Sequence, residues 1–596
     1  TIKFIHEKVL ALSIIDSAMG SGHFLVNAAY RVANEIVDIV SENKWETTND
    51  DIIVDVMHWK RKVVENSIYG IDINGLSVAL ARLSLWLISA SNNKALSFLD
   101  HHLKEGNSII GTDRKQVEVR DASSPVLDVQ YSDYMREVLR KYDELKAIGS
   151  NTKSDVAKQK EIYDEINEEL KLVKKKYDYY LANQFIGGIE KDIAYINLLR
   201  RTDVTEFEKN ELSELWRFAE EKKFFHWELE FPEVFINGGF DIVIGNPPYV
   251  EINEIEYGGN YLPMNFESQK CGNLYVYFIE NSNRIMKLDG KISFIIPLAM
   301  FCTPRMQKIQ EFIKREFERI KVAYFDCRPG TIFKHALVFA SIFTFEKQAQ
   351  PEESGIYSTK LIKWYSNERK QLFENIQYTK INNPMIISNY SIPKISCVIE
   401  NEILLKLAKK TRKLAYYIDN DNEPTILYGY GGRNWIKAMD FYPEFKKNGQ
   451  VYKSTGDRHL SFKKEIDPKV IVSILNSSIF YWNYLVYSDC RNKTKTAMLD
   501  FYIDFDEMSE VAFNELNRLG SELMESYKAN SIFKTCNYST GVVEYHEYYP
   551  KKSKAIIDEI DRVLGKYYDL DETEIEFIIN YNLRFRMGEE SEEVDE

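Results

Sequence analysis

The segment that most restricts the fold of this chain is 240–249, which reads Phe-Asp-Ile-Val-Ile-Gly-Asn-Pro-Pro-Tyr. Its first half is an apolar run rich in β-branched residues, which predicts a buried strand. The two prolines then remove backbone donors and prevent both helix formation and further sheet pairing. We therefore expect Asn246 and the carbonyl of Pro247 to be held rigidly at the carboxyl end of a strand, where open α/β sheets bind ligands.

This pair of acceptors suits the activation of an exocyclic amino group on a base. Such a nitrogen is a poor nucleophile because its lone pair is delocalised into the ring. The Asn246 side-chain oxygen and the Pro247 carbonyl can accept both of its hydrogens, which draws the nitrogen towards a tetrahedral form. Tyr249 offers a flat face on which the base can stack, a contact worth roughly 1–3 kcal/mol. The simpler alternative is a proline-rich turn that only interrupts the fold.

The sequence Asn246-Pro247-Pro248-Tyr249 resembles motif IV of amino-group DNA methyltransferases, in the asparagine form associated with N6-adenine. The preceding segment 225–235, FHWELEFPEVF, is similar to the lead-in of type IIG restriction-modification methylases and related phage-defence methylases. The resemblance implies methyl transfer from S-adenosylmethionine to adenine N6 of a base flipped out of double-stranded DNA. It also implies the gamma class, in which motifs I to VIII precede the recognition region.

A second motif lies near the start of the chain. Residues 13–18 predict a strand, Gly20 and Gly22 a tight turn, and residues 25–40 a long helix. Strand, glycine turn and helix form a nucleotide-binding arrangement. The resemblance identifies it as motif I, the S-adenosylmethionine loop, in which the glycines permit close backbone approach.

Asp16 ends the first predicted strand, and the resemblance implies that it pairs with the ammonium group of the cofactor, directly or through water. Phe24 belongs to the same predicted cofactor loop. Family members usually carry proline after the aspartate, whereas this chain has Ser17. That difference loosens the turn without removing a donor.

The second predicted strand, 67–73, ends in an acid, as ribose recognition requires. We expect Asp72 to accept from both ribose hydroxyls and Ile73 to pack on the adenine; the alternative for Asp72 is a helix N-cap. Ile109 and Ile110 are interpreted as the third strand region. Before them, Gly-Asn-Ser resembles motif III, which assigns Asn107 to the cofactor adenine, although Gly-Asn is also a common turn.

Residues 131–200 are charged and have helical periodicity, which predicts an antiparallel helical pair inserted before the fourth strand. Two roles for this insertion stay open: it is a solvated scaffold arm, or it contacts DNA or a partner chain. After motif IV, Asn273 and Tyr275 resemble motif V. Phe333 resembles the aromatic residue of motif VIII, which stacks on the flipped base opposite Tyr249; plain core packing is the alternative.

The region after residue 350 has a different charge balance from the rest of the chain. Residues 401–500 hold 17 Lys and Arg against 11 Asp and Glu, a local net charge of +6 in a chain of −14. Mixed basic, amide and aromatic groups can contact phosphates and base edges. The candidates for DNA contact are Arg433, Lys453, Arg458, Arg491, Lys493 and Lys495; unremarkable surface loops are the alternative.

Length and composition fit two to four domains of a globular protein: 596 residues, of which 44% are hydrophobic and 28% charged. The six cysteines form no Cys-x-x-Cys pair, so neither a zinc site nor a disulfide framework is indicated, and a reduced cytoplasm is expected. No apolar run predicts a membrane span. We expect a prokaryotic protein that is cytoplasmic and associated with the nucleoid.

The sequence therefore predicts an α/β protein with a class I Rossmann-like methyltransferase domain, a doubly wound and mostly parallel sheet. The predicted parts are a methyltransferase domain (1–350) with a helical insertion (131–200), an α+β recognition region (351–550), closing helices (551–588) and a disordered acidic tail (589–596). The resemblance implies a motif X before motif I, a helix and turn that close the cofactor pocket, but only about a dozen residues precede Asp16. We therefore expect motif X on another polypeptide or on a removed segment. The nuclease that is common in type IIG enzymes is expected there too.

Two alternatives to a DNA methyltransferase stay open. A protein-glutamine methyltransferase must activate an amide nitrogen and can carry the shorter motif, although the basic region after the catalytic domain argues against it. A non-catalytic subunit of a restriction or phage-defence complex would bind DNA and use the cofactor pocket as a sensor. The sequence predicts no metal site.

Overall fold

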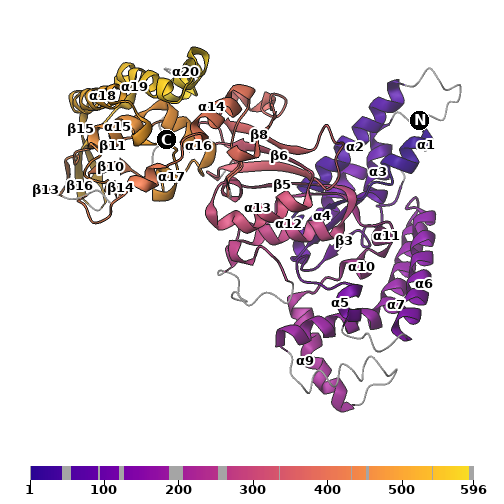
Figure 1. Cartoon of the computed structure of the whole chain (residues 1–596). Coiled ribbons are helices and arrows are strands. Elements are labelled where there is room, and N and C mark those ends of the chain that lie inside the picture. Colours follow the sequence, from indigo (N-terminus) through magenta and orange to yellow (C-terminus); the bar gives the residue numbers. More distant parts are fainter. Residues whose placement is uncertain are drawn as a thin grey trace. The chain divides into compact units, whose positions relative to one another are not determined.

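A computed structural model describes residues 2–42, 55–90, 94–119, 126–186, 206–252, 265–334, 336–388, 390–423, 425–430, 433–451, 456–539 and 541–588 (Figure 1). Lys453, the end of the predicted helical insertion and the predicted acidic tail lie outside these ranges. The chain consists of two compact units: residues 1–296, 308–320 and 342–354, and residues 297–307, 321–341 and 355–596.

A mostly parallel sheet carries the predicted motifs; its strands around β1 (Ile14–Asp16) belong to the first unit, and its last two strands belong to the second. Strand β1 lies between β2 (Ile68–Asp72) and β4 (Phe240–Gly245), and both pairings are parallel. The sheet has the order β3-β2-β1-β4-β5-β7-β6-β8-β9, with β2–β3 and β4–β5 also parallel. The remaining strands are β3 (Leu103–Glu105), β5 (Met286–Pro297), β6 (Arg319–Phe325), β7 (Ala340–Glu346), β8 (Gly355–Ile362) and β9 (Thr379–Lys380).

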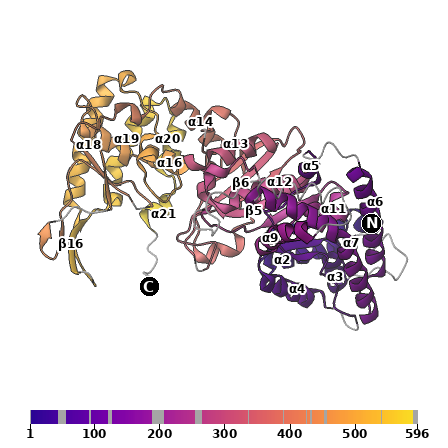
Figure 2. The ribbon, with the colours of Figure 1, turned by 90° about the horizontal axis from the view of Figure 1, so that it is seen from below.

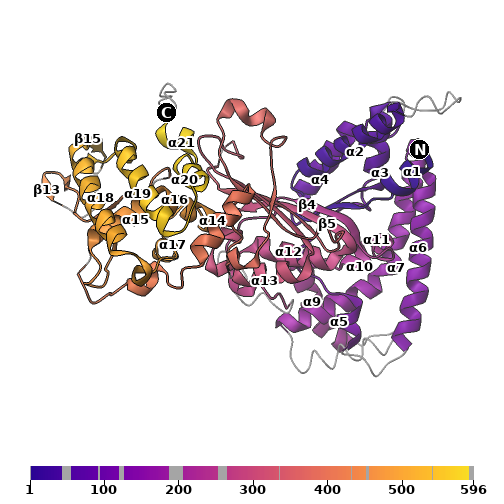
Figure 3. The same ribbon diagram turned by 45° about the horizontal axis from the view of Figure 1, so that its top comes forward.

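The strand order changes direction between β1 and β4, which is the switch point of a Rossmann-like fold. Helices cover both faces of the sheet, as Figure 3 shows: α2, α3 and α4 lie on one face, and α12 and α13 on the other. Their bounds are α2 (His23–Glu42), α3 (Val56–Asn66), α4 (Gly75–Ser89), α12 (Leu274–Ile285) and α13 (Gln307–Glu316). The predicted doubly wound α/β fold is confirmed.

Helix α2 shows why these segments become sheet-covering helices. Its buried residues are Leu25, Ala29, Ala33, Ile36 and Val40, which recur every three or four positions and so lie on one face. They join the apolar cluster that also contains Ile14 of β1 and Ile68 of β2.

The third strand differs from the sequence prediction. It is Leu103–Glu105, and Ile109 and Ile110 lie in a buried loop after it. That loop is fixed by backbone hydrogen bonds from Ile110 to Asn107 and from Phe225 to Ile110, so the isoleucine pair fills the core without pairing in the sheet. Asn107 consequently follows the third strand directly.

Two long helices lie in the region of the predicted insertion, and the first begins five residues before the predicted start at residue 131. Helix α6 (Val126–Ile148) and helix α7 (Lys153–Ile186) are joined by a short turn and run antiparallel, side by side, as Figure 1 shows. Lys141 of α6 lies 2.7 Å from Glu165 and 2.8 Å from Glu169 of α7. The other helices of this unit are α1 (Ile2–Phe4), α5 (Arg114–Val119), α9 (Glu206–Lys222), α10 (Trp227–Glu230) and α11 (Pro232–Phe235).

The second unit combines helices with two small antiparallel sheets. Its sheets have the orders β11-β10-β14 and β13-β12-β16-β15. Figure 2 shows α18, α19 and α20 packed beside one another. The bounds are α14 (Val398–Ala408), β10 (Ile426–Gly429), β11 (Ala438–Met439), β12 (Phe445–Lys447), β13 (Gln450–Val451), β14 (Asp457–Leu460), α15 (Pro468–Asn476), α16 (Ser478–Tyr487), α17 (Lys495–Leu499), α18 (Glu510–Ala529), β15 (Ile532–Tyr538), β16 (Gly541–Glu547), α19 (Lys554–Tyr567), α20 (Glu572–Ile579) and α21 (Leu583–Met587).

Among the described residues, no single helix is long and apolar enough to span a membrane. Helices α15 and α16 reach that length and composition only as a pair, which is bent by 61°. Nearly every residue of both helices is buried within the second unit.

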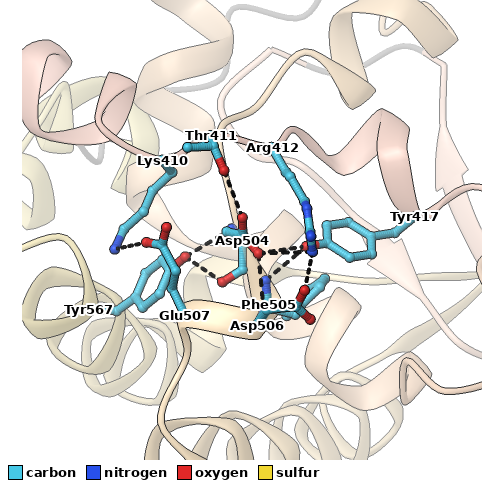
Figure 4. Close-up of polar contacts among 9 residues, drawn as sticks. All are labelled: Lys410, Thr411, Arg412, Tyr417, Asp504, Phe505, Asp506, Glu507 and Tyr567. Carbon is cyan, nitrogen blue, oxygen red and sulfur yellow. Dashed lines mark hydrogen bonds and ion pairs between the residues drawn. The ribbon is translucent and has the colours of Figure 1, made fainter.

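A buried aspartate ties the ends of several elements of the second unit together (Figure 4). The Asp504 carboxylate accepts from Thr411 (2.9 Å), Arg412 (3.3 Å) and Tyr417 (3.1 Å). Its backbone N–H donates to the Tyr567 hydroxyl (2.9 Å), which donates in turn to the Asp504 carbonyl (2.8 Å). Helix α19 is thereby joined to the turn that follows helix α14.

Replacing this carboxylate should weaken the second unit. Asp504→Ala leaves the Thr411 and Tyr417 hydroxyls without their acceptor, at a cost of about 2–3 kcal/mol. We expect the thermal midpoint to fall by roughly 5–10 °C in scanning calorimetry. Asp506→Ala is the matched control, because Asp506 also pairs with Arg412 but is 71% exposed. Equal midpoints for the two variants would contradict the assignment.

Candidate active site

The carboxyl ends of β1 and β4 meet at the switch point. A Cβ atom on Gly245 would lie 2.6 Å from Asp16 Oδ1, so only glycine permits this approach. Asn246, the next residue, is exposed and Pro247 is buried. The motif IV segment therefore starts beside the acid that ends β1.

Asp16 is a buried acid, 2% exposed. Its Oδ1 accepts the backbone N–H of Ala18 at 3.0 Å. The pKa of Asp16 is raised to about 7. Burial is the largest cause, the hydrogen bond from the Ala18 N–H opposes it in part, and the nearby charge of Asp72 adds to it. A cation placed beside this carboxyl would relieve both unfavourable effects.

The glycine turn is fastened to the end of β2. Asp72 Oδ2 accepts the N–H of Gly20 at 2.9 Å, and Oδ1 accepts the N–H of Asn74 at 2.9 Å. Gly20 has φ +54° and Gly22 has φ +83°, a backbone region in which other residues are strained. Asp72 therefore orders the glycine turn and the residue before helix α4, while the N-cap of that helix is Asn74, whose side chain accepts the N–H of Leu76 at 2.9 Å.

Exposed apolar side chains and a polar loop border this turn. Phe24 is 41% exposed and Ile73 is 52% exposed. Asn107 follows β3, and its backbone N–H donates to the carbonyl of Lys223 at 2.7 Å. The ends of β1, β2 and β3 therefore present Asp16, Asp72 and Asn107 along one edge of the sheet, where the sequence placed a cofactor.

Lys223 was not among the predicted site residues. Its Nζ donates to the carbonyl of Ile73 at 2.9 Å and pairs with Glu105 at the end of β3. Lys223 lies 150 residues from Ile73 in the sequence, so no local pattern could have predicted their contact. Its backbone has a φ of +53°. Lys223 braces the edge that carries Ile73 and Asn107.

Within motif IV, Tyr249 is hydrogen bonded to the catalytic candidate. Its hydroxyl donates to Asn246 Oδ1 at 2.6 Å and lies 2.8 Å from the carbonyl oxygen of Ile295 at the end of β5. Burial raises the pKa of the Tyr249 phenol, which keeps the donor proton in place. Its ring meets that of Tyr275 edge-on at 6.2 Å.

The predicted motif V residues border motif IV. Asn273 Nδ2 donates to Glu251 Oε1 at 3.3 Å, and the N–H of Leu274 donates to the carbonyl of Val250 at 2.9 Å. The segment after Tyr249 and the start of α12 are thus held together. Phe333 belongs to the second unit, and its stacking role stays a prediction.

The predicted DNA-contacting residues differ in their surroundings within the second unit. Arg458 and Arg491 are exposed, and the Arg458 guanidinium lies 4.6 Å from the Tyr430 ring centre. Lys495 is exposed and donates to Asn420 at 2.8 Å. Lys493 is buried, and burial lowers the pKa of its amine to about 8.

Arg433 lies in a more internal position than the sequence suggested. Its guanidinium lies 3.7 Å from Asp326 and 5.3 Å from the Phe339 ring centre. An arginine that balances a buried acid has less freedom to bind a phosphate. Its DNA contact stays a prediction.

Two family models match the chain. Residues 66–330 match the Eco57I restriction-modification methylase, and residues 1–123 match the DNA-methyltransferase domain of MmeI. Together these matches span the switch point, the glycine turn and motif IV. The chain carries a restriction-modification methylase domain.

Curated relatives agree with this methylase assignment. A putative type II restriction enzyme and methyltransferase of Methanocaldococcus jannaschii is 24% identical over 70% of this chain and 36% of its own length. The type II restriction enzyme and methyltransferase Eco57I of Escherichia coli is 22% identical over 36% of this chain and 21% of its own length. The methylase chain thus spans about a third or less of these relatives.

Solved structures of low similarity were also found. The type IIL restriction-modification enzyme MmeI in complex with DNA is 12% identical, covers 98% of this chain and 74% of its own, and has a TM-score of 0.47. A DrdV–DNA complex is 9% identical, covers 98% of this chain and 67% of its own, and has a TM-score of 0.34.

Proposed function

We propose that this methylase domain transfers a methyl group from S-adenosylmethionine to adenine N6 at a specific site in double-stranded DNA. The observation that carries the proposal is the contact of Gly245 with Asp16. This contact supports the proposal because it brings the start of the Asn-Pro-Pro-Tyr segment beside Asp16, so that we expect an amino group bound by motif IV to face a cofactor bound at the glycine turn.

The residues of the turn fit the cofactor. Asp16 is a buried acid at the end of β1, a suitable partner for an ammonium group. Asp72, Ile73 and Asn107 follow along the same sheet edge and suit a ribose and an adenine. S-adenosylmethionine, when bound, supplies an electrophilic methyl group.

The chain's own residues then act by positioning and polarisation. Asn246 Oδ1 and the Pro247 carbonyl accept the two amino hydrogens, and Tyr249 supports the base by stacking. The Tyr249 hydroxyl holds the Asn246 carboxamide before the base arrives. When an amino hydrogen binds to Oδ1, the Tyr249 O–H can turn and donate to the Ile295 carbonyl instead. DNA recognition by the second unit completes the proposal.

Asn246→Ala should abolish methylation and retain DNA binding. Removal of one of the two acceptors is expected to lower the methylation rate by about 10²–10³-fold. Single-molecule sequencing of DNA from expressing cells would reveal N6-methyladenine at one motif with the wild type and none with the variant. Equal methylation would exclude Asn246 from catalysis; no modified base in either sample would favour the cofactor-sensing subunit.

Tyr249→Phe tests the hydroxyl separately from the ring. Loss of one hydrogen bond should lower the single-turnover rate about 3- to 10-fold, whereas flipping, monitored by 2-aminopurine fluorescence at the target base, should be unchanged. Tyr249→Ala is the comparison, because it also removes the stacking surface and should weaken the fluorescence signal. A phenylalanine variant with the wild-type rate would show that the hydroxyl has no positioning role.

Cofactor affinity should depend on pH through Asp16. Below about pH 7 the carboxyl is protonated before binding, so affinity for S-adenosylmethionine should fall towards tenfold per pH unit. Above about pH 8 the ligand's own amino group loses its charge and affinity should fall again. Calorimetric titration of wild type and Asp16→Asn checks this: the variant should lack the acidic limb, and an unchanged acidic limb would contradict the assignment.

A further inference from the structure

Helix α4 is apolar on almost every side. Its polar residues are Ser77, Arg82, Ser84 and Ser89, and the hydroxyls of Ser84 and Ser89 donate to carbonyls of their own helix at 2.8 and 2.7 Å. Helices that are apolar all round are normally buried on all sides. In α4, however, the buried positions are confined to Val78, Ala81, Leu85 and Ser89.

The opposite side of α4 presents a row of exposed leucines. Leu76 and Leu87 are each 69% exposed, Leu80 is 44% exposed and Leu83 is 49% exposed. Single exposed leucines are ordinary, but four that follow one another along one helix form a continuous apolar seam. Their spacing of four, three and four residues is the spacing of the a and d positions of a coiled coil.

The spacing of the four leucines is symmetric: it is four, three and four residues whether it is counted from the amino or the carboxyl end of the helix. A twofold axis between positions 81 and 82 would set Leu76 against Leu87 of a second copy, and Leu80 against Leu83. We infer that two copies of this chain pair through α4, antiparallel and leucine to leucine, in an isologous dimer.

The charges around the seam permit this pairing. Ser77, Ala79 and Ser84 flank the leucines and carry no charge. The one charged side chain, Arg82, is held by Asp100 at 3.0 Å and by the carbonyl of Leu103 at 2.9 Å. Antiparallel helices also set opposite ends of their dipoles together. The net charge of −14 on each chain opposes association, so added salt should strengthen the dimer.

The seam is a small interface. A specific interface needs roughly 1,000 Å² of total buried surface. The surface that four leucines from each copy can bury lies near this lower limit. A dissociation constant in the micromolar range is therefore expected, about 10⁻⁶ to 10⁻⁵ M.

Sedimentation velocity at protein concentrations across the micromolar range tests the dimer. The wild type should shift from monomer to dimer, and the double variant Leu80→Glu, Leu83→Glu should stay monomeric. Leu288→Glu is the matched control, because Leu288 is 70% exposed in the same unit but outside α4, and it should dimerise like the wild type. A monomeric wild type, or a dimer that persists in the double variant, would overturn the inference.

Cysteine pairing tests the antiparallel geometry. In a background in which the partly exposed Cys397 and Cys536 are replaced by serine, a mixture of Leu80→Cys and Leu83→Cys chains should form intermolecular disulfides several-fold faster than either variant alone. Faster pairing of each variant with itself would show a parallel helix pair and overturn the arrangement. Neither experiment needs methyl transfer, so this inference and the proposed function can fail separately.

Discussion

The close approach of Asp16 to Gly245 is the constraint on which the rest of the site depends. Strand β1 pairs in parallel with both β2 and β4, so the carboxyl ends of three strands open at one edge. No side chain fits at position 245 without displacing the carboxyl of Asp16, whose Oδ1 would lie 2.6 Å from a Cβ. The strand that carries the Asn-Pro-Pro-Tyr acceptors is thereby set against the acid that ends β1. The same packing buries Asp16 and raises the pKa of its carboxyl, so a cation bound beside it would stabilise the charged form.

The lead-in to motif IV acts as a brace on this edge. His226 accepts the N–H of Thr112 through Nδ1 at 3.1 Å, and its Nε2 lies 3.0 Å from Asp178 of helix α7. Trp227 donates to the carbonyl of Ser108 at 3.0 Å, one residue beyond Asn107. The polar residues of the segment therefore fix the loop after β3 and fasten it to the inserted helices. Through Asp178, helix α7 therefore takes part in fixing this loop of the first unit.

The sequence predicts well those features that depend on neighbouring residues, and it misses those that depend on contacts between distant residues. The Asn-Pro-Pro-Tyr turn and the glycine turn restrict their own backbones, so their strands and helices were expected almost to the residue. Strand β3 was missed because it contains a buried lysine: Lys104 pairs at 3.0 Å with Glu230, which is 126 residues away, and no periodicity can show this. Lys223 was missed for the same reason, since its contacts with Ile73 and Glu105 exist only in the folded chain.

Charge counting was the least informative guide to the recognition region. Many of its basic residues already neutralise acids inside the second unit: Lys406 with Glu574, Lys410 with Glu507, Lys413 with Asp500, Arg412 with Asp504 and Asp506, and Lys469 with Asp440. The local excess of +6 already counts Asp440 and Asp500, but the other acids of these pairs lie outside residues 401–500, so the excess overstates the charge that is presented to a phosphate backbone. Arg458 and Arg491, which are exposed, are better candidates for DNA contact than Arg433, which balances Asp326.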